Sequence, residues 1–111
     1  MSERLKKLNE LLRDEVGKIL LTELDKEDDV LVTVTGADIS PTLEHATIKI
    51  SVFPPTKEEE LLKKIERQIY QIQQILNKRL SIRPVPKIRF EIDKTEEEAG
   101  RIEKLLDEVI K

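Results

Sequence analysis

The chain contains no cysteine and few aromatic residues, and both shortages restrict what it can do. Without cysteine it forms no disulfide and no thiolate metal site, as is usual in a reducing compartment. Aromatic residues make up only 3% of the sequence, so the core has to be built from Leu, Ile and Val. This scarcity argues against a protein that reads single-stranded nucleic acid by stacking bases on exposed rings.

Long hydrophobic runs are also missing. No apolar stretch reaches the length of a signal sequence or a membrane span, and the N-terminus is charged from Glu3 onward. We therefore expect a cytoplasmic protein that does not contact membranes. A chain of 111 residues is expected to fold as a single domain, residues 1–111, and to bury roughly two-thirds of its unfolded surface.

Basic residues gather in the second half of the chain. Between Leu61 and Phe90, eight Lys or Arg stand against one acid, Glu66, which gives +7 in a chain of net charge −3 and leaves −10 for the remainder. The eight are Lys63, Lys64, Arg67, Lys78, Arg79, Arg83, Lys87 and Arg89. Such segregation is typical of a polyanion-binding surface, although a solvated helix face rich in lysine would give the same count.

The first half of the chain predicts a helix followed by two strands. Apolar residues recur at helical spacing, so we expect a helix from about residue 2 to 24. Gly17 within it costs about 1 kcal/mol relative to Ala unless a neighbour packs closely on it. Residues 30–39 and 45–53 alternate and are rich in β-branched side chains, which predicts an antiparallel hairpin. Gly36 predicts a bulge or bend in the first strand.

The second half predicts a long helix, a third strand and a last helix. Thr56-x-x-Glu59 is a capping box that would open a helix over residues 57–80. At about 1.5 Å per residue this helix would be about 36 Å long, which favours a kink or break near its middle, although no Gly or Pro marks the place. Prolines at 84 and 86 then force an extended connection to a strand at residues 87–93. A second capping box, Thr95-x-x-Glu98, would open the last helix.

The elements follow the order α-β-β-α-β-α, which predicts an α+β two-layer sandwich. A helical crossover makes the second and third strands parallel, whereas the hairpin is antiparallel, so the three-stranded sheet is mixed. Helices would cover its one apolar face. The order of the strands within the sheet stays open.

Motifs of catalysis and cofactor binding are missing, so we expect no enzyme activity. The sequence has no glycine-rich phosphate loop, metal-ligand spacing or nucleophile motif. The acidic stretch at residues 25–29 lacks the alternating ligands, central Gly and closing Glu of a calcium loop. His45 is the only histidine and is expected to be a strand-end residue. We expect no catalytic residue, cofactor, metal or small-molecule substrate.

Segments along almost the whole chain resemble the ribosome-binding factor A family. They are Val32-Thr33-Val34-Thr35, Ile39-Ser40-Pro41, Leu43, Ala46, Ile48-x-Ile50-Ser51-Val52, the stretch LNKRLSIRPVPKIRF at residues 76–90, Asp93, and Arg101-Ile102-x-x-Leu105-Leu106. No single tetrapeptide is diagnostic, but the order and spacing together are specific.

The resemblance implies a KH-like fold of the second type and a ribosome assembly factor without catalytic activity. Such a factor binds the 30S small ribosomal subunit and its 16S rRNA during late maturation, and supports 5′-end processing and growth in the cold. We expect the chain to act as a monomer and its eight basic residues to bind the rRNA. Arg can grip phosphates bidentately, and the acidic remainder would limit docking to one orientation. Arg89 could instead pair with Glu91 or Asp93.

The chain departs from the family pattern at two places. RNA-binding KH domains carry a GxxG loop, and family members an Ala-x-Gly kink, where this chain has Gln68-Ile69-Tyr70 and where none of its three glycines lies. Tyr70 is expected in the core or at its boundary, although it could present its ring to a base. The basic C-terminal extension of some relatives is also absent, so we expect a short form.

A second function class is a protein-interaction module that docks through an exposed sheet edge or the long helix without RNA. Such a module would show little salt dependence in its binding. It would also be insensitive to neutralisation of the basic residues at positions 78–89.

Overall fold

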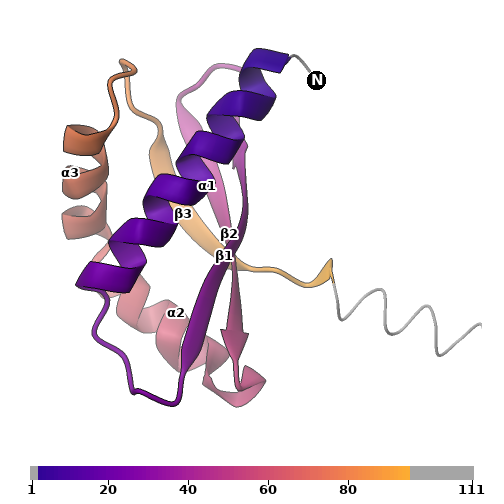
Figure 1. The fold of residues 1–111 in the computed structure, drawn as a ribbon, viewed down its shortest axis with the longest axis vertical. Coiled ribbons are helices and arrows are strands. Elements are labelled where there is room, and N and C mark those ends of the chain that lie inside the picture. The colour runs from indigo at the N-terminus through magenta and orange to yellow at the C-terminus, as the bar shows by residue number, and fades with distance from the viewer. Residues whose placement is uncertain (1–2, 96–111) are drawn as a thin grey trace, which may run out of the picture.

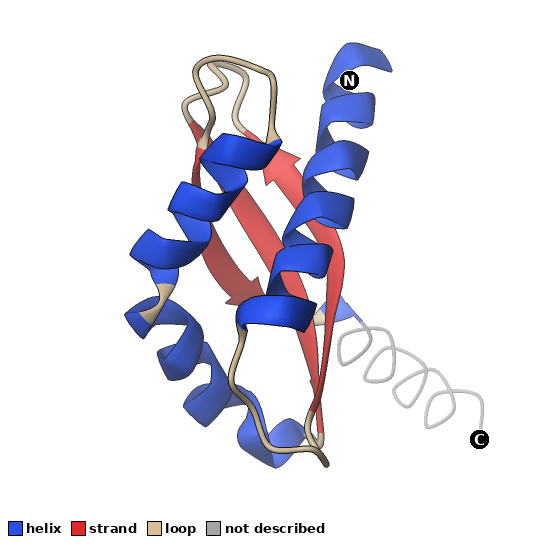
Figure 2. Cartoon of the chain, turned by 60° about the vertical axis from the view of Figure 1, so that its left-hand side comes forward, coloured by secondary structure: helices blue, strands red, loops and turns tan. Residues whose placement is uncertain are grey.

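A layer of helices covers one face of a three-stranded sheet in the computed structural model, which describes residues 3–95 (Figures 1 and 2). The elements are α1 (Glu3–Glu23), β1 (Leu31–Ile39), β2 (His45–Phe53), a short 3-10 helix η1 (Pro55–Lys57), α2 (Glu58–Arg67), α3 (Ile69–Arg79) and β3 (Lys87–Ile92). The α+β class with a mixed sheet is therefore confirmed. The last helix predicted from the second capping box lies outside the described residues.

The sheet has the order β1-β2-β3, which the sequence had left open. β1 and β2 are antiparallel, and β2 and β3 are parallel, as predicted from the helical crossover. The register of β1 against β2 shifts between Val34 and Gly36, so the predicted bulge is confirmed. One consequence is that Thr35 at the bulge turns its hydroxyl to Asp93, with Oγ1 donating to Oδ2 at 2.7 Å.

The core lies between the helices and the inner face of the sheet. Side chains from every described α-helix and strand contribute to it, namely Leu12, Val16, Ile19, Leu20, Leu24, Val30, Ile39, Ala46, Ile48, Ile50, Val52, Leu61, Ile65, Ile72, Leu76, Leu80, Ile88 and Phe90. Burial of each large aliphatic side chain stabilises the fold by about 1.5–3 kcal/mol. The other face of the sheet carries none of the described helices (Figure 2), and we call it the open face.

The break expected near the middle of the helix predicted over residues 57–80 is confirmed, and the structure places it at Gln68. α2 ends at Arg67 and α3 begins at Ile69, and Gln68 adopts φ −100° and ψ 7° between them. The side-chain amide of Gln68 donates to the Glu23 carbonyl at the end of α1, at 3.4 Å. The helix therefore breaks at the position of the Ala-x-Gly kink, although this chain has Gln68-Ile69-Tyr70 there.

The first predicted capping box, Thr56-x-x-Glu59, is wrong. Thr56 lies inside η1, and the N-cap of α2 is Lys57, which makes no side-chain capping bond. Pro54 and Pro55 explain the difference, because proline fits the start of a helical turn, and the 3-10 turn begins at Pro55 with Pro54 as its N-cap. The carboxylates of Glu58 to Glu60 in the first turn of α2 still stabilise the helix, because they lie near the positive end of its dipole.

α1 crosses the inner face of the sheet and is fastened at two further points. The Asn9 carboxamide accepts a hydrogen bond from the Ile39 backbone N–H at 2.9 Å, and Glu15 pairs with Arg79 of α3 at 2.6 Å. A Cβ on Gly17 would meet nothing within 4 Å, so no close packing accounts for this glycine. Among the described residues, no helix combines the length and the apolar character needed to cross a membrane.

Candidate nucleic-acid interface

The structure separates the eight predicted basic residues into three places. Lys63, Lys64 and Arg67 lie on α2, at the end of the molecule that also holds the acidic loop after α1. Lys64 and Arg67 line a hollow together with Asp25. The acidic carboxylates nearby reduce the positive potential that these three residues present to a polyanion.

Lys57 illustrates the influence of that acidic end. Its ammonium lies 3.6 Å from carboxylates of both Glu27 and Glu60. The two negative charges, Glu27 first, raise the pKa of Lys57 above its usual value. A cation held this way is already neutralised within the molecule.

Lys78, Arg79 and Arg83 lie at or just after the end of α3, where Lys78 is exposed and the two arginines hold the fold together. The Arg79 Nε donates to Glu15 Oε2 at 2.6 Å, and this bond holds the pKa of Glu15 below its usual value. The Arg83 guanidinium donates to the carbonyls of Leu80 at 2.8 Å and Ile82 at 2.7 Å, and more weakly to that of Asn77 at 3.3 Å. Arg83 therefore satisfies carbonyls at the helix C-terminus, where cations are favourable.

Lys87 and Arg89 lie on the open face of the sheet. β3 alternates, so Ile88 and Phe90 are buried, and Lys87 and Arg89, which alternate with them, are exposed. His45 is in register with Lys87, and Thr47 with Arg89. The Arg89 Nε donates to Thr47 Oγ1 at 3.1 Å, and its Nη2 lies 3.4 Å from Glu91 Oε1. Of the two acids named as partners of Arg89, Glu91 is therefore the one it contacts.

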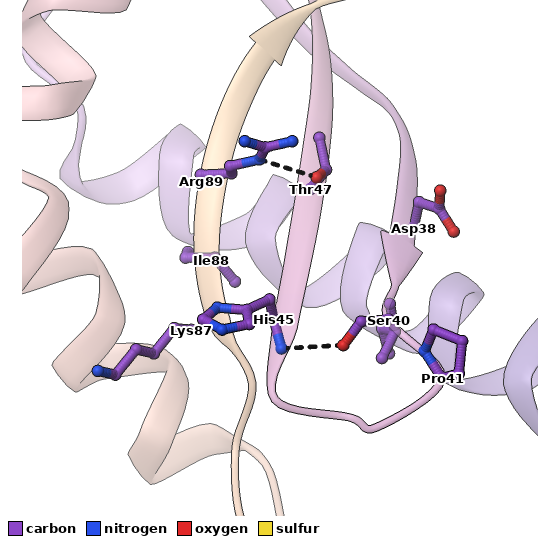
Figure 3. Close-up of a pocket in the computed structure, with 9 residues that line it drawn as sticks. Asp38, Ser40, Pro41, His45, Thr47, Lys87, Ile88 and Arg89 are labelled. Atoms are coloured by element: carbon purple, nitrogen blue, oxygen red, sulfur yellow. Dashed lines mark hydrogen bonds between the residues drawn. The ribbon is translucent and has the colours of Figure 1, made fainter.

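A hollow of ≈ 410 Å³ opens on this face where β2 and β3 begin (Figure 3). We call it the sheet hollow, and it is lined by Asp38, Ile39, Ser40, Pro41, His45, Thr47, Lys87, Ile88 and Arg89. His45 Nα–H donates to Ser40 Oγ at 3.2 Å, which ties the turn after β1 to the start of β2. Two cationic side chains and an imidazole thus line one hollow at one end of the open face.

A second hollow, of ≈ 480 Å³, lies between α3 and the edge strand β3. Tyr70 lines it and is 75% exposed, so its predicted place in the core or at its boundary is wrong. The break at Gln68 separates Tyr70 from the stripe of α2, and Ile69 and Ile72 pack toward the core instead. Lys87 and Ile88 line both hollows, so Lys87 stands between them.

Sequence reasoning missed His45 as a member of this surface. Its strand position was predicted, and the alternation of β2 places it on the same side as Thr47 and away from buried Ala46. That alternation could have identified it, together with Lys49, as a neighbour of the β3 cations. Within residues 3–95, no three His, Asp or Glu side chains are grouped so as to hold a metal ion.

Sequence comparison identifies the family to which these features belong. The family model for ribosome-binding factor A matches residues 4–106. The ribosome-binding factor A of Halothermothrix orenii is 31% identical over 108 residues, covering 96% of this chain and 88% of the relative. That of Rubrobacter xylanophilus is 33% identical over 106 residues, covering 96% of this chain and 87% of the relative.

Solved structures show the same fold. The crystal structure of ribosome-binding factor A from Thermus thermophilus superposes with a TM-score of 0.71 at 19% identity, covering 79% of this chain and 94% of that one. A model of the Thermus thermophilus factor fitted into a cryo-EM map of its complex with the 30S subunit gives a TM-score of 0.66 at 17% identity, covering 78% of this chain and 91% of that one. The KH-like fold predicted from the resemblance is confirmed. The chain belongs to the ribosome-binding factor A family.

Proposed function

We propose that this chain binds the small ribosomal subunit and contacts its 16S rRNA. The observation that carries the proposal is the family match, which extends over residues 4–106. The Thermus thermophilus member was fitted as a complex with the 30S subunit, which supports the same partner for this chain. A separate acidic end and cationic end on one molecule favour a single docking orientation on a polyanion.

The proposed role is that of an assembly factor in late subunit maturation. The chain would act in the cytoplasm as a monomer, folded as one domain over residues 1–111. It would hold one arrangement of the rRNA until 5′-end processing is complete, which matters most in the cold because misfolded RNA then rearranges slowly. This role needs binding and release but no bond to be made or broken, so the proposed factor is not an enzyme.

The eight basic residues contribute unequally in this proposal. Lys78, Lys87 and Arg89 have the most freedom to contact phosphate, because they lie away from the acidic loop and the only acid paired with any of them in residues 3–95 is Glu91, with Arg89. Arg79 and Arg83 are partly occupied by Glu15 and by backbone carbonyls. The α2 residues Lys63, Lys64 and Arg67 would supply longer-range attraction from beside the acidic loop.

The test is binding of the intact chain to purified small subunits, immature and mature, at several salt concentrations. If the chain neutralises several phosphates, the logarithm of the affinity falls linearly with the logarithm of the salt concentration, by about 0.7–0.9 per contact. Binding that is insensitive to salt would favour the alternative, a protein-interaction module. Absence of binding to either subunit form would contradict the proposed function.

A further inference from the structure

We infer that the sheet hollow is a binding site for a backbone phosphate of the rRNA, on the face of the sheet opposite the helices. This inference rests on the proposed function and specifies where one contact is made. The strand register brings the His45–Lys87 pair and the Thr47–Arg89 pair side by side, so three side chains that can carry positive charge project from two adjacent strands.

Arg89 is prepared for a phosphate. Its Nε donates to Thr47 Oγ1 at 3.1 Å, which fixes the plane of the guanidinium and leaves other N–H groups to reach a ligand. Its ion pair with Glu91 is 3.4 Å long between side chains that are 73% and 47% exposed, so a phosphate can replace Glu91 at small cost. A phosphate would offer the planar fork two acceptor oxygens.

Lys87 and His45 supply further hydrogen-bond donors to the hollow. Lys87 is exposed, has no ion pair in the described part of the chain, and stands between the two hollows. Its long flexible side chain suits a point contact with a phosphate oxygen. The imidazole of His45 lies beside it on the same side of the sheet (Figure 3), where it can donate a hydrogen bond.

Asp38 allows a test in which removal of a charge should strengthen binding. It lines the same hollow and is in register with Thr47, two strands from Arg89. A carboxylate there repels a phosphate, so its neutral replacement should strengthen binding. A residue that served only the fold would not produce a gain.

The experiment compares the full chain with two sets of charge-matched variants on small subunits. Lys87→Gln/Arg89→Gln should bind about tenfold or more weakly at 0.1 M salt, with a salt slope lower by about 2. The control Lys6→Gln/Lys7→Gln removes the same charge from the exposed surface of α1. Asp38→Asn should bind more tightly than Asp28→Asn, which removes an acid from the loop after α1. Circular dichroism melts confirm that each variant is folded.

Inorganic phosphate provides a direct probe of binding in the sheet hollow. Titrated into the labelled protein, it should shift the amide resonances of His45, Lys87 and Arg89 and leave those of Lys6 and Lys7 unmoved. If the wild type binds subunits and the Lys87/Arg89 variant matches the α1 control, the sheet hollow is not an rRNA contact and the proposed function survives. If the wild type does not bind subunits, both proposals fall.

Discussion

Arg83 shows how a basic residue can be conspicuous in the sequence and yet serve the fold. It lies in the Pro-bounded connection after α3, where its charge predicts an RNA contact. In the structure its guanidinium donates to three carbonyls at and after the end of that helix. Charge-assisted hydrogen bonds of this kind are stronger than neutral ones, but solvent exposure reduces their contribution.

Arg83→Ala should therefore lower the free energy of unfolding by about 1 kcal/mol. The carbonyls of Leu80 and Ile82 would lose their donor, and the last turn of α3 would loosen. Urea denaturation followed by circular dichroism measures the change. Lys78→Ala is the control, because Lys78 is exposed on the same turn without an ion pair in residues 3–95. Equal stability of the two variants would contradict the capping role.

Asp93 links the bulge in β1 to the end of β3. Its carboxylate accepts hydrogen bonds from Thr35 Oγ1 at 2.7 Å and from the Thr95 backbone N–H at 2.9 Å. These bonds, Thr35 first, lower the pKa of Asp93 from its usual 3.8 to about 2. Because the folded pKa is the lower one, the bonds stabilise the fold above the unfolded value, and this contribution is lost as the pH falls from about 4 to about 2.

Thr35→Val should remove part of that contribution. At pH 7 the variant is expected to be about 1 kcal/mol less stable than the wild type, after allowance for the partly solvated carboxylate. The difference in unfolding free energy between the variant and the wild type should become smaller as the pH is lowered from about 4 to about 2, where Asp93 is protonated. Denaturant unfolding of both proteins at pH 7, 4 and 2 measures this difference. Thr33→Val, on the same strand, is the control. A gap independent of pH would exclude Asp93 as its source.

At the scale of elements, Gln73 joins α3 to the edge strand β3. Its carboxamide accepts from the Ile88 N–H at 2.9 Å and donates to the Pro86 carbonyl at 3.0 Å, so it pairs with the backbone as a neighbouring strand would. The same amide nitrogen donates to Asn77 Oδ1 at 3.1 Å. The start of an otherwise open strand edge is therefore covered by a helix side chain.

Gln73→Ala should cost about 2 kcal/mol, because two partly buried backbone groups would lose their partners. Gln74→Ala, one position along on the exposed side of α3, is the matched control and should be near neutral. Amide hydrogen exchange adds a local measurement, since the Ile88 N–H should exchange faster in Gln73→Ala alone. If Ile88 stayed equally protected in both variants, the helix side chain would not be what covers the edge.

Local patterns predicted the strands better than the helix junctions. β2 was predicted with the bounds it has, His45–Phe53, because alternating burial is a property of the strand itself. The break at Gln68 could be expected from length but not placed, since its side-chain partner is the Glu23 carbonyl 45 positions away. Tyr70 was misplaced for the same reason, because the break changes the helical phase that follows it.

At the scale of the whole molecule, the basic segment predicted a single binding surface. The fold instead distributes its eight basic residues over three places. The charge count identified which residues to consider, but it could not tell that Arg79 would meet Glu15, or that Lys87 and Arg89 would project from the face of the sheet opposite the helices. Those outcomes depend on tertiary packing and on the strand register. The acidic loop after α1 and the cations at the start of β3 lie toward opposite ends of the molecule (Figure 1).

Cross-linking of the chain to small subunits, followed by mass spectrometry of the linked peptides, tests the central claim most directly. Ultraviolet light joins protein residues to RNA bases in contact with them, so the linked positions report the bound surface. We predict links between 16S rRNA and peptides that contain residues 38–49 and 78–89, and none from the acidic loop at residues 25–29. Links to rRNA that are confined to that loop would contradict the account.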